Sequence, residues 1–307
     1  MKVLDFLPIT VFFLVIFGCW HHSESVIKDE LRPTTFEELV AMSREQMRHV
    51  DIGRMNLICF NEALPSDDVD IEQMTAKLDE WADHCRKQEV RFRKSFEKNP
   101  KHYDGSYAKF KAINLVLTIK EDFKCKYQMS LVESGVMANI HSPSFFKDPN
   151  DAFISGLLQR HRGTGSSYPV LIVALGRRLG YPISIKTTVG HMFCEWNDGT
   201  EWFNIDTNGE GVDTPPDDWY ITGKIGEYGA RWASEKSDYF MRPLDNWECL
   251  GLFIETLGYC YEANGRMKDA LQAYKLALRY LPLSRNLQRI AYRRMISGDS
   301  VIQGKLR

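Results

Sequence analysis

Apolar residues in the first third of the chain recur at helical spacing. In the segment that begins at Asp70 they fall at alternating steps of three and four residues, on one helix face: Ile71, Met74, Leu78, Trp81 and Cys85. Asp70 is a typical N-cap residue for that helix. Thr35 followed by Glu38 has the pattern of a capping box and predicts another helix over about 36–50.

Further helical patterns complete this region. Helices are expected over about 54–62, 107–118 and 128–138, and the polar stretch 93–106 predicts a loop. Residues 35–145 are therefore predicted to form an N-terminal helical region. Its residues do not suggest a functional site.

The pattern changes near residue 150. NDAFISGLLQRHRG is helical, and SSYPVLIVALGRRLGYP predicts a second helix that Gly180 ends. Ser166 or Ser167 can cap the second helix, and Pro169 suits its first turn. Because its middle is almost wholly apolar, we expect it to be a buried central helix.

Strand patterns follow the central helix. ISIKTTV, HMFCEW and EWFNIDT alternate like strands, and the sequence from Asn197 to Thr200 is typical of a hairpin turn. DTPPDDW then predicts a loop. These elements predict an α+β fold that is mostly helical, with a small antiparallel sheet.

The C-terminal segment has the residue spacing of a tetratricopeptide (TPR) unit, a repeat of about 34 residues. Counted from Gly251 as position 1, positions 7, 8, 11, 20, 24, 27 and 32 carry signature residues: Leu257, Gly258, Tyr261, Ala270, Tyr274, Ala277 and Pro282. One repeat cannot bury its own face, so we expect a helix over 285–296 to cap it and the preceding domain to support it. Residues 245–307 are therefore predicted to be TPR-like helices, with a generic helical hairpin as the alternative.

The first residues have the composition of an export signal. From Phe6 to Gly18 the chain is almost wholly apolar. A run of about 13 apolar residues suits a signal-peptide core and is shorter than the ~20 that span a bilayer. The ending IFGC is similar to a bacterial lipobox, although Asp5 and the bulky Phe17 are unusual there.

We therefore predict a lipoprotein-type signal peptide over 1–18, a polar tether over 19–34 and lipidation at Cys19. The expected location is the cell envelope, anchored to a membrane. A secreted or periplasmic protein, an uncleaved anchor and a buried cytosolic helix are the alternatives. Export implies an oxidising compartment, so disulfides are allowed. The other six cysteines lack regular spacing, so the sequence predicts no pairing among them, and no metal or cofactor is expected.

Composition narrows the range of partners. The 307 residues are 44% hydrophobic and 26% charged, with a net charge of -2, which is ordinary for a globular protein. We therefore expect no nucleic-acid partner. Arg285, Arg289 and Arg293 form a local basic stripe, which we interpret as a solvated helix face, with contact to anionic lipid or a partner as the alternative.

The predicted hairpin brings a histidine and an aspartate together. If Asp198 and Gly199 form a two-residue loop, facing residues have numbers that sum to 397, and His191 lies opposite Asp206. Cys194 then points to the other face, into an apolar layer. A carboxylate can orient an imidazole at that separation, so His191 and Asp206 are the candidate site pair.

The order of a helix ending in LGYP, a strand, GH, a second strand and ID resembles the transglutaminase-like superfamily. The resemblance implies a papain-like core, with a catalytic Cys at the start of the central helix and a His and an Asp on the following strands. The position that matches the Cys is Gly165. The resemblance therefore implies that the nucleophile is missing.

The chain is also similar to SirB-type transglutaminase-like proteins with C-terminal TPR helices. The residues that carry this resemblance are DPNDAFISGLLQRHRGTGSSYPVLIVALGRRLGYP, GHMF, NIDTNGEG and the TPR unit. Arg162, Gly163 and Ser167 match the family's RG-x-P-x-S motif, and Gly165 stands where Pro is usual. The transglutaminase-like core would occupy 146–225.

These features favour a non-catalytic function. His191 and Asp206 are interpreted as a vestigial pair, with Glu195 and Trp202 either lining the same cleft or forming an exposed sheet edge. The chain would bind a protein or peptide through its TPR helices or the cleft, and a membrane through Cys19. The alternative is a hydrolase or acyltransferase that uses Ser167, His191 and Asp206.

Overall fold

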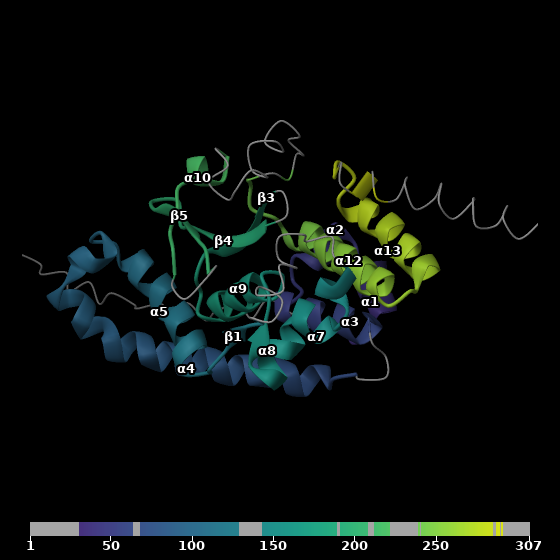
Figure 1. Cartoon of the computed structure of the whole chain (residues 1–307). Coiled ribbons are helices and arrows are strands. Elements are labelled where there is room, and N and C mark those ends of the chain that lie inside the picture. The colour runs from purple at the N-terminus through teal and green to yellow at the C-terminus, as the bar shows by residue number, and fades with distance from the viewer. Residues whose placement is uncertain are drawn as a thin grey trace, which may run out of the picture.

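The computed structural model describes residues 31–63, 68–128, 143–188, 191–207, 212–221, 239, 241–284, 287, 288 and 290. This part of the chain is mostly helical and has a small antiparallel three-stranded sheet, which confirms the predicted α+β, mostly helical class (Figure 1). The predicted signal peptide and Cys19 lie outside the described residues. Nearly all of the helices predicted over 128–138 and 285–296 also lie outside them.

The N-terminal region is a layer of helices: α1 (Phe36–Ala41), α2 (Arg44–Met47), α3 (Ile52–Ala63), α4 (Ile71–Lys98) and α5 (Tyr107–Glu121). Thr35 caps α1 in the predicted capping box with Glu38. The prediction of one helix over 36–50 is wrong, because Ser43 and Gln46 form a second capping box that begins α2.

Helix α4 is longer than its sequence pattern predicts. The helix continues through the polar residues 93–98, and the short 3-10 helix η2 (Pro100–Tyr103) follows it. The Phe96 ring packs against Tyr103, Tyr107 and Phe110, each with a ring-centroid separation under 6 Å. This aromatic packing stabilises the last turns of α4 where the local pattern is weak.

Short elements lead from α5 into the centre of the molecule: β1 (Lys126–Tyr127), η4 (Pro143–Phe146), α7 (Pro149–Ala152), α8 (Ile154–Arg160) and β2 (Arg162–Gly163). Strands β1 and β2 pair in parallel. Helix α9 (Tyr168–Arg178) follows and is buried from Tyr168 to Gly176, as its apolar sequence predicts.

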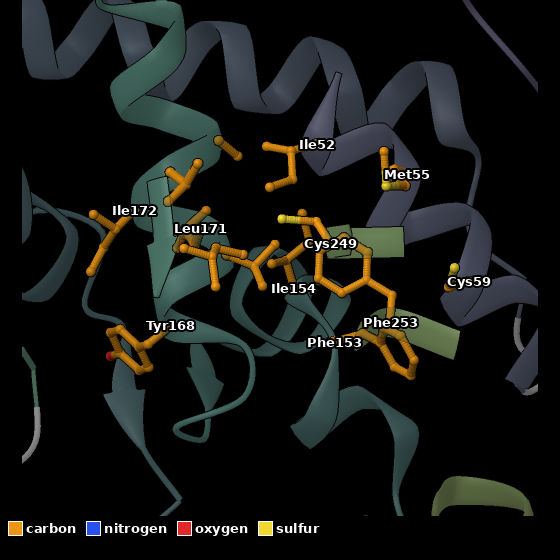
Figure 2. Close-up of a cluster of buried hydrophobic side chains, with 14 of the residues drawn as sticks. Ile52, Met55, Cys59, Phe153, Ile154, Tyr168, Leu171, Ile172, Cys249 and Phe253 are labelled. Carbon is orange, nitrogen blue, oxygen red and sulfur yellow. The ribbon is translucent and has the colours of Figure 1, made fainter. Parts of the chain in front are cut away.

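One hydrophobic core joins α3, α9 and α12 (Asn246–Ala263). Figure 2 shows side chains of the three helices in a single cluster, among them Ile52, Leu171 and Phe253. The buried cluster extends from Leu39 to Leu287. The N-terminal helices, the central helix and the C-terminal helices therefore share one core.

Strands β3 (Ile183–Thr188), β4 (His191–Asn197) and β5 (Trp202–Ile205) form the antiparallel sheet in that order. Helix α9 lies on one side of the sheet and α10 (Asp217–Ile221) lies on the other (Figure 1). We call these sides the inner face and the outer face. The prediction that DTPPDDW is wholly loop is wrong, because α10 begins within it.

Helices α12 and α13 (Met267–Tyr280) form an antiparallel hairpin at the predicted TPR positions. A Cβ at Gly258 would lie 2.4 Å from a ring carbon of Tyr274, so glycine allows the two helices to approach. On its other side, α12 packs on α3, where the Tyr261 hydroxyl donates to the Glu62 carbonyl at 2.9 Å. The hairpin is therefore an integral part of the core.

Candidate functional site

The loop of the β4–β5 hairpin has four residues instead of two. Asn197 pairs with Trp202, so the paired numbers sum to 399 and the predicted register is wrong by two residues. Asp198 stabilises the longer loop by accepting hydrogen bonds from the N–H groups of Thr200 at 2.8 Å and Glu201 at 2.7 Å. Because strand side chains alternate with a period of two, this even shift leaves every side chain on its predicted face.

His191 and Asp206 lie in contact on the outer face. Nε2 of His191 is 2.7 Å from Oδ2 of Asp206, and the Tyr220 hydroxyl of α10 donates to the same oxygen at 2.8 Å. Phe193 stacks on Tyr220 with ring centroids 4.2 Å apart. The His191 and Asp206 side chains are only 12% and 5% exposed. The structure therefore brings the predicted pair together and encloses it beneath α10.

Cys194 lies on the inner face, as the alternation predicts. Its Sγ is 3.4 Å from the Pro169 carbonyl in the first turn of α9, and the residue is fully buried. Burial raises the pKa of the thiol well above its ordinary value. A protonated thiol that faces away from His191 is not an activated nucleophile.

Gly165, the position where the sequence resemblance predicted a missing catalytic Cys, lies three residues before the first residue of α9. A Cβ on Gly165 would meet no atom within 4 Å, so the local packing has room for a side chain there. Ser166, the next residue, places its Oγ 2.8 Å from the hydroxyl of Thr164. The position is therefore open in space and lacks a reactive group.

Ser167 is held by the main chain. Its hydroxyl is wholly buried, accepts from the Thr164 N–H at 3.0 Å and donates to the Asp151 carbonyl at 3.2 Å. It forms no hydrogen bond with His191 among the described residues. Ser167 occupies the N-cap position of α9, as one of the two predicted candidates, but its side chain accepts no hydrogen bond from the first turn of the helix.

The start of α9 and the His191–Asp206 pair belong to opposite sides of the sheet. Tyr168, the first residue of α9, stacks on Tyr127 with ring centroids 4.6 Å apart. The Tyr127 hydroxyl lies 3.2 Å from the hydroxyl of Thr207, which follows Asp206. The stacked rings of Tyr168 and Tyr127 therefore connect the start of α9 with Thr207, the residue after Asp206.

A buried charged cluster beside the pair was not predicted. Nζ of Lys186 on β3 lies 3.0 Å from Oε2 of Glu195 and 3.2 Å from Oδ1 of Asn204. The same amine lies 3.0 Å from Oδ1 of Asp217 and beneath the Trp202 ring, 4.5 Å from its centroid. Lys186 and Glu195 are 1% and 3% exposed, so Glu195 is not part of an exposed sheet edge.

The signal for this cluster was present in the alternation of the three strands. Lys186, Glu195 and Asn204 are neighbouring polar residues on the outer face of β3, β4 and β5. The hairpin prediction paired only β4 with β5, and the β3–β4 register was needed to add the lysine. Asp217 could not be found in this way, because it comes from α10.

Other kinds of site find little support in the described part of the chain. Its residues show no group of three or more His, Cys, Asp or Glu side chains placed to hold a metal ion. None of its helices has the length and apolar character that a membrane crossing requires. A surface cavity of about 390 Å³ lies near the far end of β4, and its lining includes Arg177, Ser184 and Asn197 but not His191.

Comparison with family models, curated protein sequences and solved structures finds no match for this chain. The functional argument therefore rests on the geometry of the site. That geometry is a His–Asp pair and a charged cluster on the outer face, with the residues at the start of α9 on the inner side.

Proposed function

We propose that the chain is a non-catalytic, transglutaminase-like protein with a TPR-type hairpin, and that it binds a protein or peptide partner. The observation that carries this proposal is the placement of Ser167. Its hydroxyl is buried and held by main-chain groups of Thr164 and Asp151, with no hydrogen bond to His191. A serine nucleophile needs its base within hydrogen-bond reach, so the hydrolase alternative lacks a supporting contact.

His191 and Asp206 have a structural role in this proposal. Asp206 accepts from the Tyr220 hydroxyl while it contacts His191, so the pair anchors α10 to the sheet. Asp206 also exchanges two backbone hydrogen bonds of 2.9 Å with Asp213, which directs the chain toward α10. The pair thus stabilises the outer face rather than activating a nucleophile.

The partner surface we infer is the outer side of α13. Helix α12 packs on α3 and η4 on one side and on α13 on the other, so these sides are covered by other parts of the chain. Helix α13 exposes a stripe of three basic residues and one glutamine at steps of three and four residues: Lys268, Gln272, Lys275 and Arg279. A stripe of this charge suits a partner that presents acidic side chains.

We also propose that the protein is exported and held at a membrane by a lipid on Cys19. The support is the apolar run before Cys19 and the IFGC ending. Metabolic labelling with palmitate tests this part separately. Label that persists in a Cys19→Ala variant contradicts the anchor.

A cysteine introduced at position 165 tests the loss of catalysis directly. In a Cys19→Ala background, Gly165→Cys should fold, because the added side chain enters open space. Its thiol should react with iodoacetamide with the pH profile of an ordinary thiol, half-maximal near pH ~8.5, because His191 faces away. Ser166→Cys is the matched control at the neighbouring position.

Two outcomes contradict the non-catalytic proposal. One is a Gly165→Cys thiol that is fully reactive near neutral pH and loses this reactivity when His191→Ala is added. The other is labelling of the natural chain by a fluorophosphonate serine probe that disappears in Ser167→Ala.

Charge reversal on α13 tests the partner surface. The double variant Lys268→Glu and Lys275→Glu should lose the partners that chemical cross-linking captures on the wild-type protein in its native host. The matched control is Lys94→Glu with Lys98→Glu, two exposed lysines of α4. Equal capture by both double variants contradicts docking at α13.

A further inference from the structure

The charged cluster on the outer face places an amine against a carboxamide. Nζ of Lys186 lies 3.2 Å from Oδ1 of Asn204, and both residues are 1% exposed. The two residues stand on β3 and β5, on either side of β4. Backbone pairing and burial therefore hold a nucleophilic atom next to a carbonyl group that it can attack.

Carboxylates flank both reacting groups. Oε2 of Glu195 lies 3.0 Å from the Lys186 amine, and Oδ1 of Asp217 lies 3.0 Å from it. The Asn204 amide nitrogen donates to Oδ1 of Asp217 at 2.9 Å and to the Pro215 carbonyl at 2.9 Å. Each proton that must leave the amine or reach the departing nitrogen therefore has an adjacent carrier.

Aromatic rings limit the access of water to the amine. The Trp202 ring centroid lies 4.5 Å from Nζ of Lys186, and the Phe193 ring centroid lies 5.9 Å from it. A dry site protects an amine from full solvation and protects an amide from hydrolysis. The cluster thus combines proximity, proton carriers and shielding around one lysine and one asparagine.

We propose that Lys186 and Asn204 join in an intramolecular isopeptide bond that the folded chain forms by itself. Glu195 takes one proton from the Lys186 ammonium, and the neutral amine attacks Cγ of Asn204. A bond between Nζ and Cγ forms while the bond between Cγ and Nδ2 breaks. The amine's second proton passes through Asp217 to Nδ2, and the nitrogen departs as ammonia, which the Glu195 proton converts to ammonium.

This reaction needs no oxidant, reductant or external acyl donor. One amide is exchanged for another, and the carbonyl carbon keeps its oxidation state. The bond ties β3 to β5 across β4 and fixes the outer face beneath α10. The bond involves neither His191 nor a partner. The test of the bond is therefore independent of the proposed function.

Asn204 is favoured over Asp217 as the acyl group. Both oxygens of Asp217 approach the amine, at 3.0 and 3.2 Å, but its side chain is 31% exposed. A solvated carboxylate resists attack by an amine, whereas a buried carboxamide with a proton carrier at its nitrogen has a leaving group. The two routes release different molecules, ammonia from Asn204 and water from Asp217, so mass distinguishes them.

Peptide mass spectrometry of the purified full-length wild-type protein tests the proposal. Trypsin cuts after Arg178 but not after an acylated lysine, and endoproteinase Glu-C cuts after Glu195 and Glu201. The expected product is Leu179–Glu195 joined to Trp202–Glu210, lighter than the sum of the two peptides by one ammonia. Fragmentation must place the link between Lys186 and Asn204.

Three results overturn the proposal. The first is recovery of free Leu179–Lys186 with unmodified Trp202–Glu210 as the only products. The second is a link to Gly211–Lys224 with loss of water, which assigns the bond to Asp217. The third is loss of ammonia within Trp202–Glu210 alone, without a joined peptide.

Variants test the assigned roles. Lys186→Arg keeps the charge but cannot form the bond, so the joined peptide should be absent. Glu195→Gln removes the proton acceptor and should reduce the joined fraction at least tenfold. The matched control is Lys111→Arg, because the Lys111 amine also lies over aromatic rings, those of Tyr107 and Tyr181. This variant should give the wild-type product. Joined peptide in Glu195→Gln at the wild-type level contradicts the role of Glu195.

Discussion

At the centre of the β3–β4–β5 sheet the two faces are equally buried but are held together by different forces. The inner face presents Ile185, Cys194 and Ile205 to α9, and each is at most 1% exposed. At the same depth on the outer face, Lys186 and Asn204 are 1% exposed. Apolar burial stabilises the inner face, whereas the outer face depends on each polar group having its partners.

The difference lies in how each face fails. An apolar layer loses stability gradually, because each deleted methyl group removes a local contribution and leaves a small cavity. A buried ionic layer fails abruptly, because removal of one partner leaves an uncompensated charge. The outer face also depends on α10, which supplies Asp217 and Tyr220. The sheet therefore has one face determined by its own strands and another completed by a later segment.

The largest effect is expected from Lys186→Met on the outer face. The reference is Lys186→Arg, which keeps the positive charge but cannot form the isopeptide bond. Relative to that variant, Lys186→Met leaves Glu195, 3% exposed, without its cation. We expect the free energy of unfolding to fall by about 4 kcal/mol, as is typical when a buried ion pair is broken. Urea unfolding at pH 7 measures this change.

The double variant Lys186→Met with Glu195→Met separates charge imbalance from other losses. It replaces both buried charges by apolar side chains, so it should recover roughly half or more of the lost stability. If Lys186→Met alone lowers the free energy of unfolding by less than ~1 kcal/mol, water already screens the charges of the cluster.

Ile185→Ala is the matching change on the inner face, one residue along the same strand. Ile185 is fully buried and pairs with Cys194. We expect a loss of about 3 kcal/mol from reduced burial and a residual cavity. The loss should be unchanged in a Glu195→Met background, and strong coupling between the two substitutions would contradict the independence of the faces.

The inner face could be predicted from the sequence because its signals are local. Alternation placed Cys194 with the apolar residues, and the error in loop length did not alter this, because the register shifted by two. The apolar run from Val170 to Leu175 likewise predicted the buried helix α9. Local periodicity is sufficient when one element covers another by apolar contact alone.

The outer face could not be predicted fully because its partners are distant in sequence. Lys186 contacts Asp217, 31 residues later, and that residue belongs to a helix begun in a stretch predicted as loop. The break between α1 and α2 does have a local signal in the sequence, the capping box of Ser43 and Gln46. The extension of α4 depends instead on aromatic packing of Phe96, which no local pattern shows.

A smaller effect is expected from Tyr220→Phe, which removes a single hydroxyl between α10 and the outer face. Asp206 keeps its contact with His191 but loses the hydrogen bond of 2.8 Å. We expect a loss of about 2 kcal/mol, since the acceptor is a carboxylate. Amide hydrogen exchange should accelerate in α10 and stay unchanged in α12. Tyr127→Phe is the control on the other side of the sheet, and equal acceleration in α10 from both variants contradicts the assignment.

The smallest effect at neutral pH is expected for the thiols of the core. Cys194 on the inner face and Cys249 on α12 are free and fully buried. In a Cys19→Ala background, a thiol reagent should not label the native protein at pH 7 and should label six cysteines after unfolding. Rapid labelling of the native protein contradicts the burial of the inner face.

The same thiols should reduce stability only in alkaline solution. Burial raises the pKa of Cys249 from 9.0 to about 12, so between these values the folded chain keeps a proton that the unfolded chain has lost. The contribution of this thiol is therefore complete below pH 9 and is lost as the pH rises toward 12. Unfolding curves measured across this range should lose part of their pH dependence in Cys249→Ala. If the stability of Cys249→Ala has the same pH dependence as that of the wild type, other groups dominate in this range. The outer-face variant Tyr220→Phe is the control and should keep the contribution of Cys249.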